Sequence, residues 1–309
     1  MIKNSRAKIY IRRELEEKIE RFLHSPEIIA IVGARQTGKT TLMGKVFEGV
    51  KDDAVFLDFE DREVLSLFQE DVKAFAKLHV EGRKFVFIDE FQYAEEGGRL
   101  LKYLYDHYPT AKFIISGSSG LDLTVKAVRY LVGRIFAFEL FPFNFTEFLS
   151  FKEPNLYEGF YKGWIEDIGN CEEISQPLHK RLMSLWEEFS IWGGYPRVVL
   201  SDSDEEKKEV LKGIINTYLL KDIRGFFRLA TERHLQRLMK ALALQIGNLV
   251  HYNELSQASD LPYKALKEHL SILEQTYILR FAVPYYTNKR LEVVKNPKVY
   301  FGDTGLRNL

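Results

Sequence analysis

The sequence predicts an α/β fold with a parallel sheet, followed by a helical region and by a smaller unit of helices and a hairpin. Short, continuously apolar runs alternate with amphipathic segments through the first part of the chain. This is the pattern of strands buried on both faces of a parallel sheet and joined by helices. After Pro142 the strand patterns stop, and from Arg233 helical patterns precede two apolar runs. We therefore expect three domains, at residues 1–145, 146–232 and 233–309.

The first domain alternates helices and strands along its length. Residues 8–24 space apolar side chains at helical intervals, and Ser25-Pro26 ends that helix. The expected strands occupy residues 27–33, 54–60, 84–90, 112–118 and 134–140. The expected helices between them occupy residues 38–48, 61–78, 96–108 and 121–131. Right-handed crossovers would join the strands in the order 5-1-4-3-2.

Composition excludes several classes of protein. Lys plus Arg and Asp plus Glu both total 44, so no nucleic-acid surface is expected over the whole chain. Cys171 is the only cysteine, so it cannot form an internal disulfide, and no metal-binding spacing surrounds it. The first 24 residues are too charged for a secretory leader, and no apolar run approaches the ~18 residues that span a membrane. We expect a cytoplasmic protein without a membrane partner.

Residues 33–40 read GARQTGKT and match the phosphate-binding pattern G-x-x-x-x-G-K-[ST]. Gly33 and Gly38 would let backbone amides approach phosphate oxygens, and the helix that begins near Gly38 would present its positive end to the same anion. Lys39 would reach the β- and γ-phosphates, and Thr40 would bind Mg²⁺. The pattern follows an expected strand and begins an expected helix, as it must. The nucleotide-binding residues are then Gly33, Ala34, Arg35, Gln36, Thr37, Gly38, Lys39, Thr40 and Thr41.

Two carboxylates, Asp89 and Glu90, end an apolar strand at the edge of the sheet that carries the phosphate loop. Asp89 would hold Mg²⁺ directly or through water, and Glu90 would act as a general base on the attacking water. A catalytic carboxylate after the metal-binding Asp predicts hydrolysis rather than transfer to a small acceptor. The alternative is that the pair caps the next helix. Gln92 would place water or sense phosphate, or else is a surface residue.

Further candidates lie at the ends of neighbouring strands. Ser116 and Ser118 end the fourth strand, and Ser118 would contact the γ-phosphate or the water unless the segment is an ordinary turn. Arg134 begins the fifth strand and would stabilise transition-state charge, within the chain or across a subunit interface. Arg129 is its competitor, and a structural ion pair is the alternative for Arg134.

The nucleotide is expected to be ATP. GTPases of the Ras type read guanine with an Asn-Lys-x-Asp segment, whereas Asn288-Lys289 is followed here by Arg290 and Leu291, outside the α/β domain. The string DEFQ at residues 89–92 is similar to a helicase box, but a helicase would need a second core for which the chain has no room. We therefore expect ATP and Mg²⁺ as cofactors.

Several segments together resemble one family. In order, they read GARQTGKT, FVFIDEFQ, FIISGSS, LVGRIFAFELFPFNFTEF, WGGYPRVVL and TYLLKDI. They resemble a group of archaeal and bacterial AAA+-like ATPases related to the signal-transducing STAND class, over nearly the whole chain. The resemblance implies a P-loop NTPase sheet, a helical lid and a C-terminal winged helix. It also implies that Gly194 and Pro196, on either side of Tyr195, contact the nucleotide; the alternative is a helix break packed in the core.

Many members of this group continue past the winged helix into a nuclease-like domain of unknown function. The present sequence ends at KVYFGDTGLRNL, near where that domain would begin. Either the chain is cut before that domain, or it is a short member of the group. We therefore expect no nuclease activity and assign no catalytic role to Asp303.

The expected winged helix has features of a DNA-binding surface. Residues 233–290 carry a net charge of +4 in a chain that is neutral as a whole. In the helix that begins at Pro262, three leucines would form a core stripe: Leu266, Leu270 and Leu273. Another face carries the candidates for double-stranded DNA, which are Tyr263, Lys264, Lys267 and Ser271. In STAND relatives the winged helix commonly packs on the nucleotide domain as a switch, so both roles remain open.

Three functions follow as alternatives. The first is an ATPase whose turnover moves the lid and the winged helix, with or without DNA. The second is a nucleotide switch, with slow or absent hydrolysis, that acts on a protein partner. The third is a DNA-binding regulator whose P-loop senses a ligand. Glu90 favours turnover, and a homo-oligomer would be needed for Arg134 to act on a neighbouring subunit.

Overall fold

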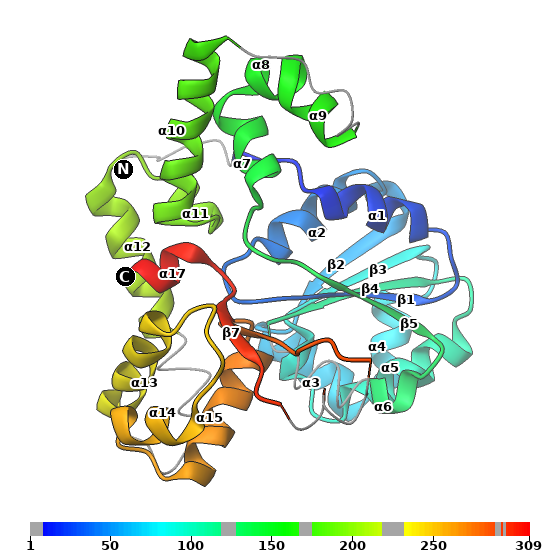
Figure 1. Cartoon of the computed structure of the whole chain (residues 1–309). Coiled ribbons are helices and arrows are strands. Elements are labelled where there is room, and N and C mark those ends of the chain that lie inside the picture. Colours follow the sequence, from blue (N-terminus) through cyan, green and yellow to red (C-terminus); the bar gives the residue numbers. More distant parts are fainter. Residues whose placement is uncertain (1–8, 119–127, 167–174, 218–231, 288–291, 293–294) are drawn as a thin grey trace, which may run out of the picture.

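A computed structural model shows a sheet flanked by helices, with a helical region and a C-terminal unit beside it (Figure 1). It describes residues 9–118, 128–166, 175–217, 232–287, 292 and 295–309. Cys171 and most of the helix expected at 121–131 lie outside these residues; the described remainder of that helix is α6 (Val128–Leu131).

The sheet is parallel, and its strand order β2-β3-β4-β1-β5 is the predicted order read from the other edge. Its strands are β1 (Ile28–Val32), β2 (Ala54–Asp58), β3 (Phe85–Asp89), β4 (Lys112–Gly117) and β5 (Ile135–Glu139). Every residue of the three central strands β3, β4 and β1 is buried, as their mainly apolar sequences predict. The prediction of an α/β fold with this topology is confirmed.

Helices cover both faces of the sheet because alternate side chains of each strand point to opposite sides. The helices on one face are α1 (Glu14–Phe22) and α2 (Lys39–Glu48), and those on the other are α3 (Arg62–Glu70), α4 (Val72–His79) and α5 (Gly97–His107). Ile29 and Ile31 pack against the first pair, whereas Ile28 and Ala30 belong to the core on the other face. The three central strands of the sheet are thus buried between two helical layers.

The segment expected as a single helix at residues 61–78 forms two helices, α3 and α4. The break falls at Asp71, whose side chain accepts hydrogen bonds from the backbone of Lys73 and Ala74. Its backbone, at φ −142° and ψ 80°, is not helical, as is typical of an N-cap. The periodicity of the apolar residues continues through the break, so the pattern alone does not reveal it.

The helical region lies above the sheet in Figure 1. It contains α7 (Phe145–Lys152), α8 (Pro154–Leu156), a π-helical turn (Tyr157–Tyr161), α9 (Lys162–Glu166), α10 (Gln176–Trp192), α11 (Pro196–Val199) and α12 (Asp204–Thr217). Asn144 and Glu147 form a capping box that begins α7 directly after the sheet.

The C-terminal unit has the predicted order of three helices and a hairpin. It comprises α13 (Glu232–Leu244), α14 (Tyr252–Ser259), α15 (Tyr263–Gln275), the antiparallel pair β6 (Leu279–Ala282) and β7 (Lys298–Phe301), and α17 (Thr304–Asn308). Leu266, Leu270 and Leu273 are buried, so the core stripe of α15 is confirmed. The interpretation of the whole C-terminal unit as a winged helix stays a prediction. Among the described residues, no helix combines the length and apolar character needed to cross a bilayer.

Candidate active site

The segment GARQTGKT forms the connection between β1 and α2, at the carboxyl edge of the sheet. Gln36 and Gly38 adopt left-handed backbone conformations, at φ 62° and 94°. A Cβ atom on Gly33 would lie 2.2 Å from the carbonyl oxygen of Leu140, so only glycine fits there. Both glycines are therefore required by the path of the loop, independently of any ligand.

Lys39 begins α2 and is buried against the loop. Its Nζ donates hydrogen bonds to the carbonyls of Gly33 (3.0 Å) and Ala34 (2.8 Å), and the hydroxyl of Thr37 donates to the same Ala34 carbonyl. Thr40 stays exposed beside it, at a helix N-terminus whose amides favour anions. The loop therefore presents a cation and the N-terminal end of a helix on one edge of the sheet.

Asp89 is buried at the carboxyl end of β3. Its Oδ1 accepts hydrogen bonds from the hydroxyl of Ser116, at the end of β4, and from the backbone N–H of Glu90. The parallel pairing of β3 with β4 brings these side chains together. The carboxyl ends of β3 and β4 thus lie side by side in the structure, as the sequence predicts.

Glu90 follows Asp89 in a left-handed conformation, at φ 52°. This conformation is disfavoured for a residue with a side chain and turns the chain into the short helix at Phe91–Tyr93. Burial raises the pKa of the Glu90 carboxyl, while the hydrogen bond from Gln92 and the charge of Lys39 oppose that rise. A carboxyl group with a raised pKa is suited to accept a proton near neutral pH.

Gln92 connects the Glu90 carboxylate to the end of β4. Its Nε2 donates to Glu90 Oε2, and its Oε1 accepts from the backbone N–H of Ser118 at 3.2 Å. Ser118 is buried. Ser118 and Glu90 therefore bind the two polar atoms of one side-chain amide.

A cleft of about 590 Å³ lies over the phosphate loop. It is lined by Ile9, Arg35, Gln36, Gly38, Lys39, Thr40, Thr41, Glu90, Pro196, Arg197 and Leu200. Pro196 comes from the helical region, and its Cγ is 3.8 Å from where a Cβ of Gly38 would be. Of the predicted pair Gly194 and Pro196, the structure thus places Pro196 against the loop.

Gly194 packs behind the cleft rather than in it. Its carbonyl accepts a hydrogen bond from the backbone N–H of Phe143, and its own N–H donates to Asp303 Oδ2 at 2.7 Å. Burial raises the pKa of Asp303 to about 6, against the hydrogen bonds from Gly194, Leu306 and Gly305. Asp303 therefore connects the lid segment to the first turn of α17.

A smaller pocket of about 90 Å³ adjoins the cleft. Residues from the N-terminal segment line it together with the lid and the start of α2. They are Ile9, Tyr10, Ile11, Arg13, Gly38, Thr41, Phe143, Pro196 and Leu200. Its lining is mainly apolar, unlike the phosphate loop beside it.

Arg134 lies at the opposite edge of the sheet from the phosphate loop. It directly precedes β5, whose first residue pairs with Ile28 at the amino end of β1. The length of a five-residue strand, roughly 16 Å, therefore separates it from the loop. Its guanidinium instead pairs with Asp106 at 3.5 Å and lies over the ring of Tyr105.

Of the two alternatives left open for Arg134, the structure does not bring its side chain to the phosphate edge of its own chain. The amino end of a parallel strand lies away from the phosphate edge, and the position of Arg134 at the start of its strand already implied this. Action across a subunit interface stays a prediction. The side chain of Arg129, the competitor, lies outside the described part of the structure.

The donor set fits Mg²⁺ only together with a nucleotide. Within the described ranges, no group of three or more His, Cys, Asp or Glu side chains could hold a metal ion by itself. The site offers the Asp89 carboxylate and the exposed Thr40 hydroxyl, and oxygen ligands of this kind suit Mg²⁺ when phosphates complete its shell.

The four candidate DNA-binding residues of α15 are all exposed. Lys267 Nζ lies 5.1 Å from the ring centres of both Tyr252 and Tyr263. These residues line a groove of about 610 Å³ with the hairpin connection. The Ser271 hydroxyl accepts a hydrogen bond from Gln275.

Comparison with known proteins supports the class of the first domain. The sequence model of an AAA domain matches residues 25–149, and that of a domain of unknown function (DUF8612) matches residues 183–309. With the phosphate loop and the sheet order, the first match identifies an AAA+-like P-loop ATPase domain. The second match begins within α10, so the predicted boundaries at 145 and 232 stay predictions.

Individual relatives extend the similarity over the chain. An uncharacterized protein of Methanocaldococcus jannaschii is 28% identical over 251 residues, which cover 80% of this chain and 51% of the relative. One of Haemophilus influenzae is 24% identical and aligns over 98% of this chain and 74% of its own length. The chain thus spans about half the length of the archaeal relative.

A solved structure shows the same fold. The Walker-type ATPase of Pyrococcus abyssi superposes with a TM-score of 0.58 and 19% identity, over 98% of this chain and 96% of that chain. At this level of identity the similarity concerns the fold. The residues of the cleft must therefore be argued from their own geometry.

Proposed function

We propose that this protein binds ATP with Mg²⁺ in the cleft over the phosphate loop and hydrolyses it. The observation that carries the proposal is that one cleft contains Lys39, Glu90 and Pro196, from the loop, the edge of β3 and the lid. A phosphate loop alone supports binding. A glutamate with a raised pKa beside it supports a reaction with water.

Each group of the cleft has a role in this reaction. The loop amides and Lys39 hold the phosphates, and Thr40 and Asp89 hold Mg²⁺, which would neutralise charge on the transferred phosphoryl group. Glu90 accepts a proton from the attacking water, and Gln92 fixes its carboxylate. Ser118, whose N–H binds Gln92, would report on the γ-phosphate through that bond.

The small apolar pocket beside the cleft suits the base of the nucleotide. Its walls include Ile9, Ile11, Pro196 and Leu200, and apolar surfaces of this kind bind the faces of a purine. Because the pocket adjoins Thr41 and Gly38, a base bound there keeps its phosphates over the loop. We infer that adenine occupies this pocket.

The nucleotide state would reach the C-terminal unit through the lid segment. Pro196 lines the cleft together with the loop, Gly194 binds Asp303, and Asp303 caps α17, which follows β7 of the hairpin. In Figure 1 α17 lies beside α10 and α12. A movement of Pro196 on hydrolysis would therefore be transmitted to the hairpin unit by way of Asp303.

Lys39→Ala tests the proposal directly. Wild type should hydrolyse ATP in a Mg²⁺-dependent manner, and the variant should bind ATP at least about tenfold more weakly, because a charged hydrogen-bond donor to the phosphates is lost. Isothermal titration and a phosphate-release assay measure the two effects.

Lys51→Ala is the matched control, because Lys51 is exposed and outside the cleft; it should behave as wild type. Wild-type binding without any turnover would instead favour a switch that acts on a protein partner. Lys39→Ala with unchanged affinity would contradict the proposed site.

A second candidate function, binding of double-stranded DNA, is favoured by the surroundings of Lys267. Two tyrosine rings hold its ammonium at the mouth of an open groove, and Lys264 lies exposed on the same helix. Fixed cations on an exposed helix bind phosphates of a duplex. The net charge of +4 over residues 233–290 also favours binding to the phosphates of DNA.

Lys267→Ala should weaken DNA binding and reduce the slope of log affinity against log salt by about 1, because one phosphate contact is lost. Fluorescence anisotropy with duplex DNA across a salt series measures both quantities. Lys208→Ala, on an exposed position of α12, is the control. Absence of salt-sensitive binding by wild type at low ionic strength would reject this function.

A further inference from the structure

Arg13 is a buried cation in the N-terminal segment, directly before α1. Only 5% of its side chain is exposed. Its three donor groups bind three different parts of the chain: Nη1 donates to the Thr37 carbonyl at 2.9 Å, Nη2 to the Phe141 carbonyl at 2.6 Å, and Nε to Glu147 Oε1 at 3.0 Å. The guanidinium also lies 4.6 Å from the ring centre of Phe143. Such a planar fork is specific to arginine.

The bond to Thr37 fixes one peptide of the phosphate loop. The carbonyl of Thr37 and the N–H of Gly38 belong to the same planar trans peptide, so they point in opposite directions. With the carbonyl held by Arg13, the Gly38 N–H is directed to the other side of the loop. Gly38 lines the cleft over the phosphate loop, so its amide would be available to phosphates bound there.

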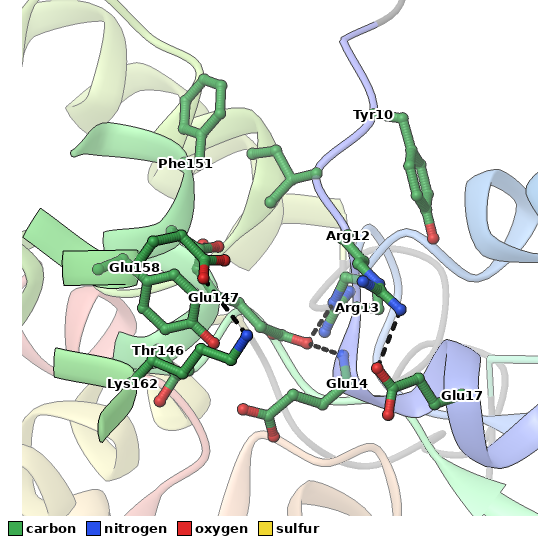
Figure 2. Close-up of a pocket in the computed structure, with 13 residues that line it drawn as sticks. Tyr10, Arg12, Arg13, Glu14, Glu17, Thr146, Glu147, Phe151, Glu158 and Lys162 are labelled. Atoms are coloured by element: carbon green, nitrogen blue, oxygen red, sulfur yellow. Dashed lines mark hydrogen bonds and ion pairs between the residues drawn. The ribbon is translucent and has the colours of Figure 1, made fainter. Parts of the chain in front are cut away.

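The same guanidinium binds the loop to the lid through Glu147. Figure 2 shows Arg13 and the backbone N–H of Glu14 both meeting the Glu147 carboxylate. Glu147 is 6% exposed, and its other oxygen accepts from the Asn144 backbone in the capping box of α7. The first turn of α7 and the phosphate loop are therefore held by one buried ion pair.

We propose that Arg13 is a positioning residue of the nucleotide site, which aims the Gly38 amide at the phosphates and couples the loop to α7 through Glu147. The inference rests on the proposed binding of a nucleotide in the cleft but not on its hydrolysis. Arg13 does not line the cleft over the phosphate loop, although it forms part of the wall of the small apolar pocket beside it. Toward the phosphates it acts through the backbone of the loop. Its loss should therefore weaken the binding of ADP and ATP alike.

The test uses Arg13→Gln and Arg13→Lys in the full chain. Affinity for a fluorescent ADP analogue with Mg²⁺ is measured well below the melting temperature of each variant, which is followed by circular dichroism. Arg13→Gln should bind about tenfold more weakly, equivalent to one charge-assisted hydrogen bond. Arg13→Lys keeps the charge but cannot bind the same three acceptors at once. Its affinity for the ADP analogue should therefore lie between those of wild type and Arg13→Gln.

Arg12 supplies the matched control. It is the neighbouring arginine, 71% exposed, and it pairs with Glu17 on the surface (Figure 2). Arg12→Gln should bind the analogue like wild type. A purely structural role for Arg13 would lower the melting temperature without changing the affinity of the folded protein.

Two outcomes separate this inference from the proposed function. Wild-type affinity in folded Arg13→Lys and Arg13→Gln would overturn the inference and leave the function standing; if Arg13→Gln does not fold, the Arg13→Lys affinity decides alone. Nucleotide binding by wild type without hydrolysis would remove the hydrolytic function, while the loss of affinity in the Arg13 variants would still support the inference. Wild type that binds no nucleotide would overturn both.

Discussion

Replacing Glu90 with Gln should lower the kcat of ATP hydrolysis by about 100-fold or more, the usual effect of removing a general base, while ATP binding remains. Glutamine has the same shape and can keep a hydrogen bond to Gln92, so the cleft should stay folded. It cannot accept a proton from water. The rate of phosphate release under saturating ATP measures the effect, and titration with ATP measures the binding.

The pH dependence of the wild-type rate gives a second measure of the same residue. The base must be deprotonated to act, so the rate should fall as the pH drops through the pKa of Glu90. Because burial raises that pKa, the acid limb should appear at higher pH than an exposed glutamate would give. In Glu90→Gln the residual rate should lose this limb.

Glu96→Gln is the matched control for Glu90. Glu96 is also a glutamate in the left-handed region, at φ 49°, but it is exposed and pairs with Arg99 on the surface. Its replacement should leave kcat unchanged. Equal rates for Glu90→Gln and wild type would show that another group activates the water.

The sheet and the phosphate edge could be predicted because their signals are local. Uninterrupted apolar runs such as residues 85–88 mark central strands, and strand ends in a parallel sheet share one edge. That rule places Asp89, Glu90 and Ser116 near one another from the sequence alone. The same rule, applied to the start of a strand, argues against a role for Arg134 at the phosphate edge of its own chain. The structure shows Arg134 at the amino end of β5, away from that edge.

The contacts that join the domains leave no such local signal. Arg13 and Glu147 are 134 residues apart, and Gly194 and Asp303 are 109 residues apart. Each pair consists of common residue types in segments whose periodicity does not require a buried partner. The sequence therefore predicts the chemistry of the cleft but not the bonds that connect the cleft to the lid and the C-terminal unit.

Replacing Gly194 with Ala should destabilise the protein by about 3–5 kcal/mol, through overpacking and the loss of a buried hydrogen bond. A Cβ at this position would lie 2.0 Å from the carbonyl oxygen of Phe143. Relief of that overlap must move the segment away from Phe143 and so weaken the bond to Asp303. Urea unfolding followed by circular dichroism measures the change.

Gly213→Ala is the contrasting control. Gly213 lies in α12, and an added Cβ there would have no atom within 4 Å outside its own helix backbone, so alanine should stabilise the helix by about 0.5–1 kcal/mol. An unchanged midpoint in Gly194→Ala would show that the segment can shift without loss of packing. Affinity for ATP then decides the functional question, because Pro196 lies two residues further along and lines the cleft over the phosphate loop. If Gly194→Ala is destabilised but its folded form binds ATP like wild type, Gly194 serves packing alone, and the lid segment does not transmit the nucleotide state.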